Sequence, residues 1–305
     1  MKRTLKFLII NTFIISSISM QAQNVSPFEL TDTWLAKIEK ISPSSANNNT
    51  KQKILIFSLH TGFKHWTIPH TEAVMKLLAE KSGRYTVELS KDILSFNKKN
   101  LKQFDAIILN NNCSVGDFRN LFYDKLKENK NLSQKEIKKR ALKLENNLLN
   151  FVKKGGGLMA LHGAIVMQNK SKNFGEMIGG SFDYHPKQQN IDVKLSDVNH
   201  PILKGFKGKG FTHFDEPYFF NNAYFDYNFK PLLYMETNKL DGLKEKAQDK
   251  IKYISWIKKY GKGRVFYSSP SHNAQSFENA KLLEFFTNGM HYVTGNLDCD
   301  DSPMQ

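Results

Sequence analysis

Cysteine is scarce in this sequence, with only Cys113 and Cys299 among 305 residues. A chain of this length buries a core large enough to fold without disulfides. In an oxidising compartment the two thiols have the chemistry to pair, but one lies in the body and the other in the polar tail DCDDSPMQ. We expect them to remain unpaired. No cysteine lies close to the end of the first apolar segment, so nothing indicates a lipoprotein.

The sequence also has no recognisable nucleic-acid-binding motif, although its formal net charge is +15. Much of the excess lies in residues 125–143, KLKENKNLSQKEIKKRALK, where a few glutamates stand among the lysines at helical spacing. No aromatic residues suited to base stacking lie between them. This pattern is typical of a solvated helix face, and we expect no nucleic-acid partner. A structural or partner-binding function that uses this basic segment has the least support among the functions considered for the protein.

No apolar run is long enough for a comfortable membrane span. The first residues, MKRTLKFLIINTFIISSISMQAQ, have a basic start, an apolar stretch over 8–18 and small or polar residues around Ala22. This layout predicts a secretory signal peptide over 1–22, and an uncleaved anchor is the alternative. Cleavage would remove three basic residues and lower the charge from +15 to +12. We therefore expect a periplasmic protein without stable membrane insertion.

Within residues 53–295 no segment has the composition of a linker, which indicates one domain. Residues 28–41 have one apolar face at helical spacing, and the polar stretch SPSSANNNT follows them. The predicted organisation is a signal peptide over 1–22, a helix and linker over 23–52, the main domain over 53–295 and a polar tail over 296–305. The oligomeric state is not predicted.

Strand-like and helical patterns alternate through the first half of the main domain. Expected strands cover 53–60, 85–90, 104–112 and 158–162, and expected helices begin at Pro69 or cover 117–129 and 133–153. This alternation predicts an α/β fold with a doubly wound, mostly parallel sheet. The second half has strand-like runs with hairpin-sized gaps before a last helix over 280–293; the runs are 191–197, 211–220, 231–237, 251–260 and 263–272. These strands either extend the sheet or form an antiparallel flank.

Histidines follow three separate expected strands, at His60, His162 and His272. A doubly wound sheet gathers its carboxyl ends along one edge, so we expect these side chains to converge, together with His65 and His185 from nearby loops. Taken singly, each is more often structural. The convergence favours metal binding or proton transfer.

His162 ends the run GGGLMALHGA, where a strand turns sharply into the following segment. A cysteine or serine at such a turn is a nucleophile, whereas a histidine binds a metal or moves a proton. Asp215 and Glu216 stand inside an aromatic run, and alternation along a strand predicts that one of them enters the site. That carboxylate is a general base or metal ligand, or else a partner of Arg264 or Lys64.

Three histidines and a carboxylate suit zinc or a similar divalent metal, with His162, His185 and His272 as the candidate ligands. No HxH or HExxH spacing fixes such a site, so metal binding stays open. We expect no nucleotide cofactor.

Six segments in order resemble the ThuA-like (trehalose utilisation) family over about 53–295. They are GFKHWTI, KKGGGLMALHGA, IGGSFDYHP, NHPILKG, FDEPYFF and YGKGRVFYSSPSH. The resemblance implies a flavodoxin-like fold related to class I glutamine amidotransferases, without glutaminase activity, because ALHGA replaces the cysteine elbow and Cys113 follows another strand. By motif it implies six site residues, with His60 less secure and His70 outside the pattern: His65, His162, His185, Asp215, Glu216 and His272.

The resemblance also implies carbohydrate metabolism and a substrate such as a 3-keto-glycoside. A ketone at C3 acidifies the C2 proton, and its loss expels the group on C1; this needs a base, an electrophile and an acid. Cleavage and isomerisation use the same groups, and a non-catalytic sugar-binding protein is the alternative. Catalytic candidates are His162, Glu216, Asp215 and His65, and substrate-binding candidates are Lys64, Trp66, Tyr184, Tyr218 and Arg264.

Overall fold

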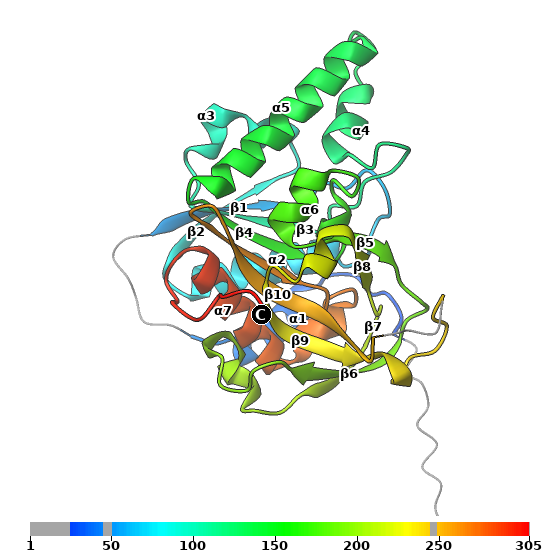
Figure 1. The fold of residues 1–305 in the computed structure, drawn as a ribbon. Helices are drawn as coiled ribbons and strands as arrows, with labels where there is room; N and C mark the ends of the chain where they lie inside the picture. Colours follow the sequence, from blue (N-terminus) through cyan, green and yellow to red (C-terminus); the bar gives the residue numbers. More distant parts are fainter. Residues whose placement is uncertain (1–24, 45–50, 245–248, 305) are drawn as a thin grey trace, which may run out of the picture.

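The computed structural model describes residues 25–44, 51–244 and 249–304, so the expected signal peptide lies outside the described residues. Figure 1 shows helices on both faces of a central sheet. The helices are α1 (Asp32–Ile41), α2 (Ile68–Lys81), α3 (Lys98–Leu101), α4 (Leu121–Lys127), α5 (Gln134–Lys153), α6 (Lys172–Ile178) and α7 (Ala280–Val293). The strands are β1 (Gln52–Phe57), β2 (Tyr85–Ser90), β3 (Ala106–Asn110), β4 (Gly157–Leu161), β5 (Ser181–Tyr184), β6 (Gln189–Leu195), β7 (Phe211–Asp215), β8 (Phe219–Asn221), β9 (Lys230–Glu236), β10 (Ile251–Tyr260) and β11 (Gly263–Ser268).

The main sheet has nine strands in the order β2-β1-β3-β4-β11-β10-β9-β6-β7. The first five are mutually parallel, which confirms the predicted α/β fold. Their central members are buried on both faces, as the continuous apolar runs predict. The remaining strands pair antiparallel and extend the same sheet, which decides between the two arrangements left open by the sequence.

The run 211–220 is not one strand, as expected, but two. β7 ends at Asp215 and pairs with β6, whereas β8 begins at Phe219 and pairs with β5 in a separate two-stranded sheet. Pro217 stands between them and has no N–H to donate to a ladder, which favours a break at this point. The break leaves Glu216 in the connection between two sheets.

Helices cover the sheet on both faces (Figure 1). α1, α2 and α7 contribute to one apolar core, and α4, α5 and α6 contribute to the other. α1 begins at Asp32 rather than at residue 28, because the Thr31 side chain accepts a hydrogen bond from Trp34 N and caps the helix there. α4 is shorter than expected. The short helical turns over 93–101, including α3, were not predicted.

The carboxyl ends of the parallel strands form one edge of the sheet. β1 ends at Phe57 and β11 at Ser268, so His60 and His272 lie in loops beyond the strands rather than on them. His162 directly follows β4. Among the described residues, no helix is both long and apolar enough to cross a membrane.

Candidate active site

His162 is fully buried at the elbow after β4, where the chain enters the 3-10 turn His162–Val166. Its φ is +46°, in the left-handed region that residues other than glycine and asparagine seldom adopt. Such backbone strain persists only where surrounding contacts fix it, and it is frequent at functional sites. The His162 Nδ1–H donates to the Ser269 carbonyl oxygen over 2.7 Å, which holds the ring in one orientation.

One carboxylate oxygen is the centre of the site. Glu216 Oε2 lies 3.3 Å from His162 Nε2, 3.1 Å from His272 Nδ1 and 3.7 Å from His185 Nε2. The His162 Nε2 and His272 Nδ1 atoms are themselves 3.1 Å apart. The structure thus brings together three of the expected histidines and one of the two expected carboxylates.

The ring orientations require a positive charge at this point. His162 donates its Nδ1–H to Ser269, and His185 donates its own to the Pro186 carbonyl oxygen over 2.9 Å. In the neutral form, each ring therefore turns an Nε2 lone pair toward the Glu216 carboxylate. Lone pairs and a carboxylate repel at these distances, so a shared proton or a metal cation is needed between them.

The proton of His272 fits this arrangement. The Gln188 amide nitrogen lies 3.0 Å from His272 Nε2, while Gln188 Oε1 accepts from Asn273 Nδ2. The amide nitrogen donates to Nε2, which leaves the imidazole proton on Nδ1, facing Glu216. Burial lowers the pKa of His272, but the hydrogen bond to Glu216 and the negative charges of Glu216 and Asp215 together outweigh burial and raise that pKa. Burial raises the pKa of Glu216, but the hydrogen bonds of His162 and His272 hold it well below its usual range.

His65 joins the site from the loop after β1. Its ring centroid lies 4.9 Å from that of His162 and 5.1 Å from that of His272. Burial, together with these two neighbouring histidines, lowers the pKa of His65 to about 2, so its imidazole is neutral near pH 7. Neutral histidines and an ionised carboxylate are the protonation states that a metal ion requires of its ligands.

The donor set fits a divalent metal. One ligand atom from each of His65, His162, His272 and Glu216 lies within 4.8 Å of the others, and all four residues are buried. Three imidazoles and a carboxylate suit zinc or a related ion. The backbone acceptor behind His162 is the kind of second contact that orients a metal ligand. His185, an expected ligand, lies outside this group of four and faces Glu216 from a site that is 35% exposed.

Cys113 lies behind His65 and is not a nucleophile. Its Sγ is 3.9 Å from His65 Nδ1, and burial raises the pKa of the thiol to about 12. Gly163 allows this close packing, because a Cβ there would lie 2.7 Å from Cys113 Sγ and 2.8 Å from His65 Cε1. Cys113 and Cys299 are both free thiols.

Asp215 was expected to be catalytic but is not a member of the group of four residues around Glu216. Its Oδ2 lies 2.5 Å from His213 Nε2 and accepts from the backbone N–H groups of Ser271 and His272 over 3.0 and 3.4 Å. Burial raises the pKa of Asp215, but His213 outweighs it and lowers the pKa to about 2. Asp215 is therefore a positioning residue for the loop that carries His272, paired neither with Arg264 nor with Lys64.

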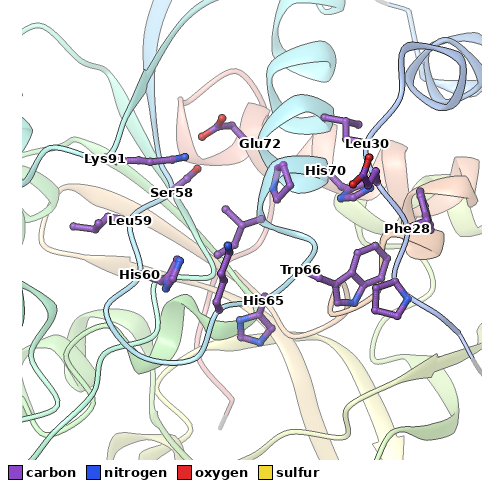
Figure 2. Close-up of a pocket in the computed structure, with 15 residues that line it drawn as sticks. Phe28, Leu30, Ser58, Leu59, His60, His65, Trp66, His70, Glu72 and Lys91 are labelled. Carbon is purple, nitrogen blue, oxygen red and sulfur yellow. The ribbon is translucent and has the colours of Figure 1, made fainter.

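A cavity of about 660 Å³ reaches the cluster through His65. Lys64 and Trp66, both expected to contact substrate, line it as well, and Figure 2 shows His65 and Trp66 among the residues that line the cavity. Tyr218 is buried, with its ring centroid 4.3 Å from that of His162. The roles of these residues in binding remain predictions.

Two expected substrate-binding residues lie elsewhere. Arg264 pairs in register with Gly157 at the start of β4, at the opposite edge of the sheet from His162, and forms an ion pair with Asp298. Arg264 begins its strand rather than ending it, so the structure does not bring it to the cluster. Tyr184 stacks on Phe219 at a centroid distance of 4.7 Å and does not line the cavity.

Gln188 and His213 contact the site residues and were not anticipated. Gln188 directly precedes β6 and His213 lies two residues before Asp215, so neither has the strand-end position that drew attention to His162. The alternation of β7 was the available signal for His213, because residues two apart share a face of a strand.

Comparisons with known proteins agree with this architecture. The family described as "ThuA: Trehalose utilisation" matches residues 53–293. A ThuA-like protein from Bacteroides uniformis superposes with a TM-score of 0.60 at 17% identity, covering 82% of this chain and 94% of its own. A ThuA-like protein from Parabacteroides merdae superposes with a TM-score of 0.57 at 16% identity, covering 83% of this chain and 98% of its own. At these identities the likeness shows the fold. No curated protein matches the chain.

Proposed function

This chain belongs to the ThuA family, which is linked to trehalose utilisation, and we propose that it is an enzyme that acts on an oxidised sugar, a 3-keto-glycoside, by acid–base chemistry. The observation that carries the proposal is the meeting of three imidazole nitrogens at Glu216 Oε2 within 3.1–3.7 Å. Groups that share a proton in a buried cluster and border a cavity are typical of catalytic sites.

The reaction needs proton transfer from C2 and to the leaving oxygen on C1, and no redox partner. A base takes the C2 proton, the electron pair of that C–H bond forms a C1=C2 double bond, and the C1–O bond breaks. The departing oxygen takes a proton from an acid. Negative charge develops on the C3 oxygen, and a nearby cation or N–H donor stabilises it.

The described residues supply these needs in the following way. His65 lines the cavity and is the member of the cluster that meets the sugar. Glu216 and His272 hold a mobile proton between them, and His185, which is 35% exposed, exchanges it with solvent. Asp215 fixes the loop that carries His272. Alternatively, a divalent metal held by His65, His162, His272 and Glu216 would take the place of this shared proton and would polarise the C3 ketone.

Turnover of a 3-keto-glycoside tests the proposal, with the released alcohol as the readout. His162→Asn is the variant to use, because asparagine tolerates the left-handed backbone better than alanine. We expect it to lose at least about 100-fold in rate, as is usual when a general acid–base group is removed. His291→Asn is the matched control, because His291 lies in α7 and outside the cluster. Unchanged turnover in His162→Asn would refute the proposal.

We propose further that the protein is exported to the periplasm. Support comes from the basic start, apolar stretch and small residues of positions 1–22. N-terminal sequencing of the protein from a periplasmic extract tests this; a start at residue 23 is expected, and recovery of an intact N-terminus from the cytoplasm would contradict it.

A further inference from the structure

The segment over residues 25–31 lies against the cavity although it precedes the part of the chain that the family matches. Pro27, Phe28, Glu29 and Leu30 all line the cavity of about 660 Å³. We call residues 25–31 the N-terminal segment. The part of the cavity that it forms is thus built by residues outside the family-matched domain.

α1 fixes the N-terminal segment in place. Trp34 and Ile38 of this helix are buried in the main core. Glu278 accepts a hydrogen bond from Trp34 Nε1 over 2.9 Å and forms an ion pair with Lys37 at 2.6 Å. Because a helix anchored in the core directly follows it, the N-terminal segment is a built wall of the cavity rather than a loose end.

Phe28 extends an aromatic surface that begins beside the catalytic cluster. Its ring lies 5.3 Å from the Trp66 ring and 4.9 Å from the His70 ring, in edge-to-face contacts. Trp66 directly follows His65. Figure 2 shows Phe28, Trp66 and His70 on one side of the cavity and His60, Leu59 and Lys91 on the other.

The cavity also has charged side chains without a partner. Within the described part of the chain, the side chains of Lys64, Lys91 and Glu72 form no ion pair or hydrogen bond, and all three line the cavity. A surface with rings on one side and hydrogen-bonding charges on the other suits a sugar ring, which has apolar C–H faces and hydroxyl edges. The volume lies well within the range of small-molecule sites, about 300–1,000 Å³.

We propose that Phe28 and Trp66 form a second sugar subsite, which binds the leaving-group half of a disaccharide and makes the N-terminal segment a specificity element. The placement of the reacting half at His65 rests on the proposed function. Phe28 then selects disaccharide over simple alkyl glycosides, because the leaving group of the latter is too small to reach the aromatic surface.

Binding and turnover together test this subsite. Affinity for trehalose and cellobiose, compared with methyl glucosides, is measured by calorimetry on wild type, Phe28→Ala, Phe28→Leu and Phe28→Tyr. We expect Phe28→Ala to weaken disaccharide binding about tenfold, as loss of one aromatic contact predicts, and Phe28→Tyr to retain it. Phe28→Leu keeps the apolar bulk and lacks the ring, so it serves if the alanine variant misfolds. Phe225→Ala, at a 53% exposed phenylalanine outside the cavity, is the control.

The ratio of kcat/KM for a 3-keto-disaccharide to that for a methyl 3-keto-glucoside gives the second readout. A fall of about tenfold in this ratio in Phe28→Ala supports the subsite. If wild type turns over neither substrate but binds disaccharide more tightly than Phe28→Ala does, the subsite stands and the enzyme proposal fails. Equal disaccharide affinity in wild type and both ring-deleted variants, or no binding by wild type, overturns the subsite.

Discussion

Replacing Glu216 with glutamine removes the charge at the centre of the site while keeping its size. In the wild type, Glu216 Oε2 lies 3.1 Å from His272 Nδ1. Unit charges at this distance interact by about 5 kcal/mol at an effective dielectric constant of about 20. Water and relaxation of the site reduce this figure but do not change its sign, so we expect the pKa of His272 to fall.

The sign of the effect follows from the contributions to the pKa of His272. Burial lowers this pKa, and the hydrogen bond to Glu216 together with the charges of Glu216 and Asp215 reverses that effect and leaves the pKa raised. Stability from the pair is therefore present below pH 6.5 and is lost as the pH rises through the raised pKa of His272. In Glu216→Gln, the charge of Glu216 that raises the pKa of His272 is absent while burial still lowers it, so this pKa should fall.

Histidine Cε1–H chemical shifts of the metal-free protein, followed against pH by NMR, measure this directly. Glu236→Gln is the control, because Glu236 forms its ion pairs with lysines at another part of the sheet. A zinc titration adds a second readout, in which Glu216→Gln should bind about 100-fold more weakly or worse. An unchanged pKa of His272 would refute the placement of the shared proton.

Three further substitutions test other parts of the account. Gly163→Ala would place a Cβ 2.8 Å from His65 Cε1 and should lower the free energy of unfolding in urea by about 1–3 kcal/mol. Asp215→Asn removes a charged acceptor from Ser271 N and should cost about 1.5–3 kcal/mol in the same assay. Burial lowers the pKa of His291 to about 4, so its contribution to stability is lost as the pH falls from about 6.5 to 4. His291→Gln should reduce that loss by about 1–2 kcal/mol, allowing for partial exposure.

Each substitution has its own contradicting result. Gly163 is not among the glycines with a positive φ, so crowding rather than backbone strain is the expected cause of the loss. An unchanged free energy of unfolding in Gly163→Ala would contradict the crowding at this position. An unchanged free energy of unfolding in Asp215→Asn would contradict the role of Asp215 in fixing the loop that carries His272. Parallel pH profiles for wild type and His291→Gln would contradict the lowered pKa.

Much of the fold and part of the site follow from simple patterns. Continuous apolar runs identified the parallel strands, and the rule that their carboxyl ends share an edge brought His162 near His65 and His272. Alternation predicted that one of Asp215 and Glu216 enters the site, and Glu216 does so.

Other features depend on contacts between distant segments, which patterns along the chain do not encode. His272 lies four residues beyond β11, and Asp215 from another strand sets the course of that loop. The break between β7 and β8 separates two sheets, and the N-terminal segment reaches the cavity only through the packing of α1. The rule on strand ends also separates Arg264 from the site, because Arg264 lies at the start of β11 and the site lies beyond the end of that strand.

The most direct test of the central claim is exchange of the C2 proton of a 3-keto-glycoside in D₂O, followed by proton NMR with and without added zinc. Proton abstraction at C2 precedes both cleavage and isomerisation, so the test does not depend on the final product. We predict loss of the C2–H signal in wild type at a rate well above that in buffer, and a return to the buffer rate in Glu216→Gln. Exchange at the buffer rate in wild type, both with and without zinc, would contradict the account.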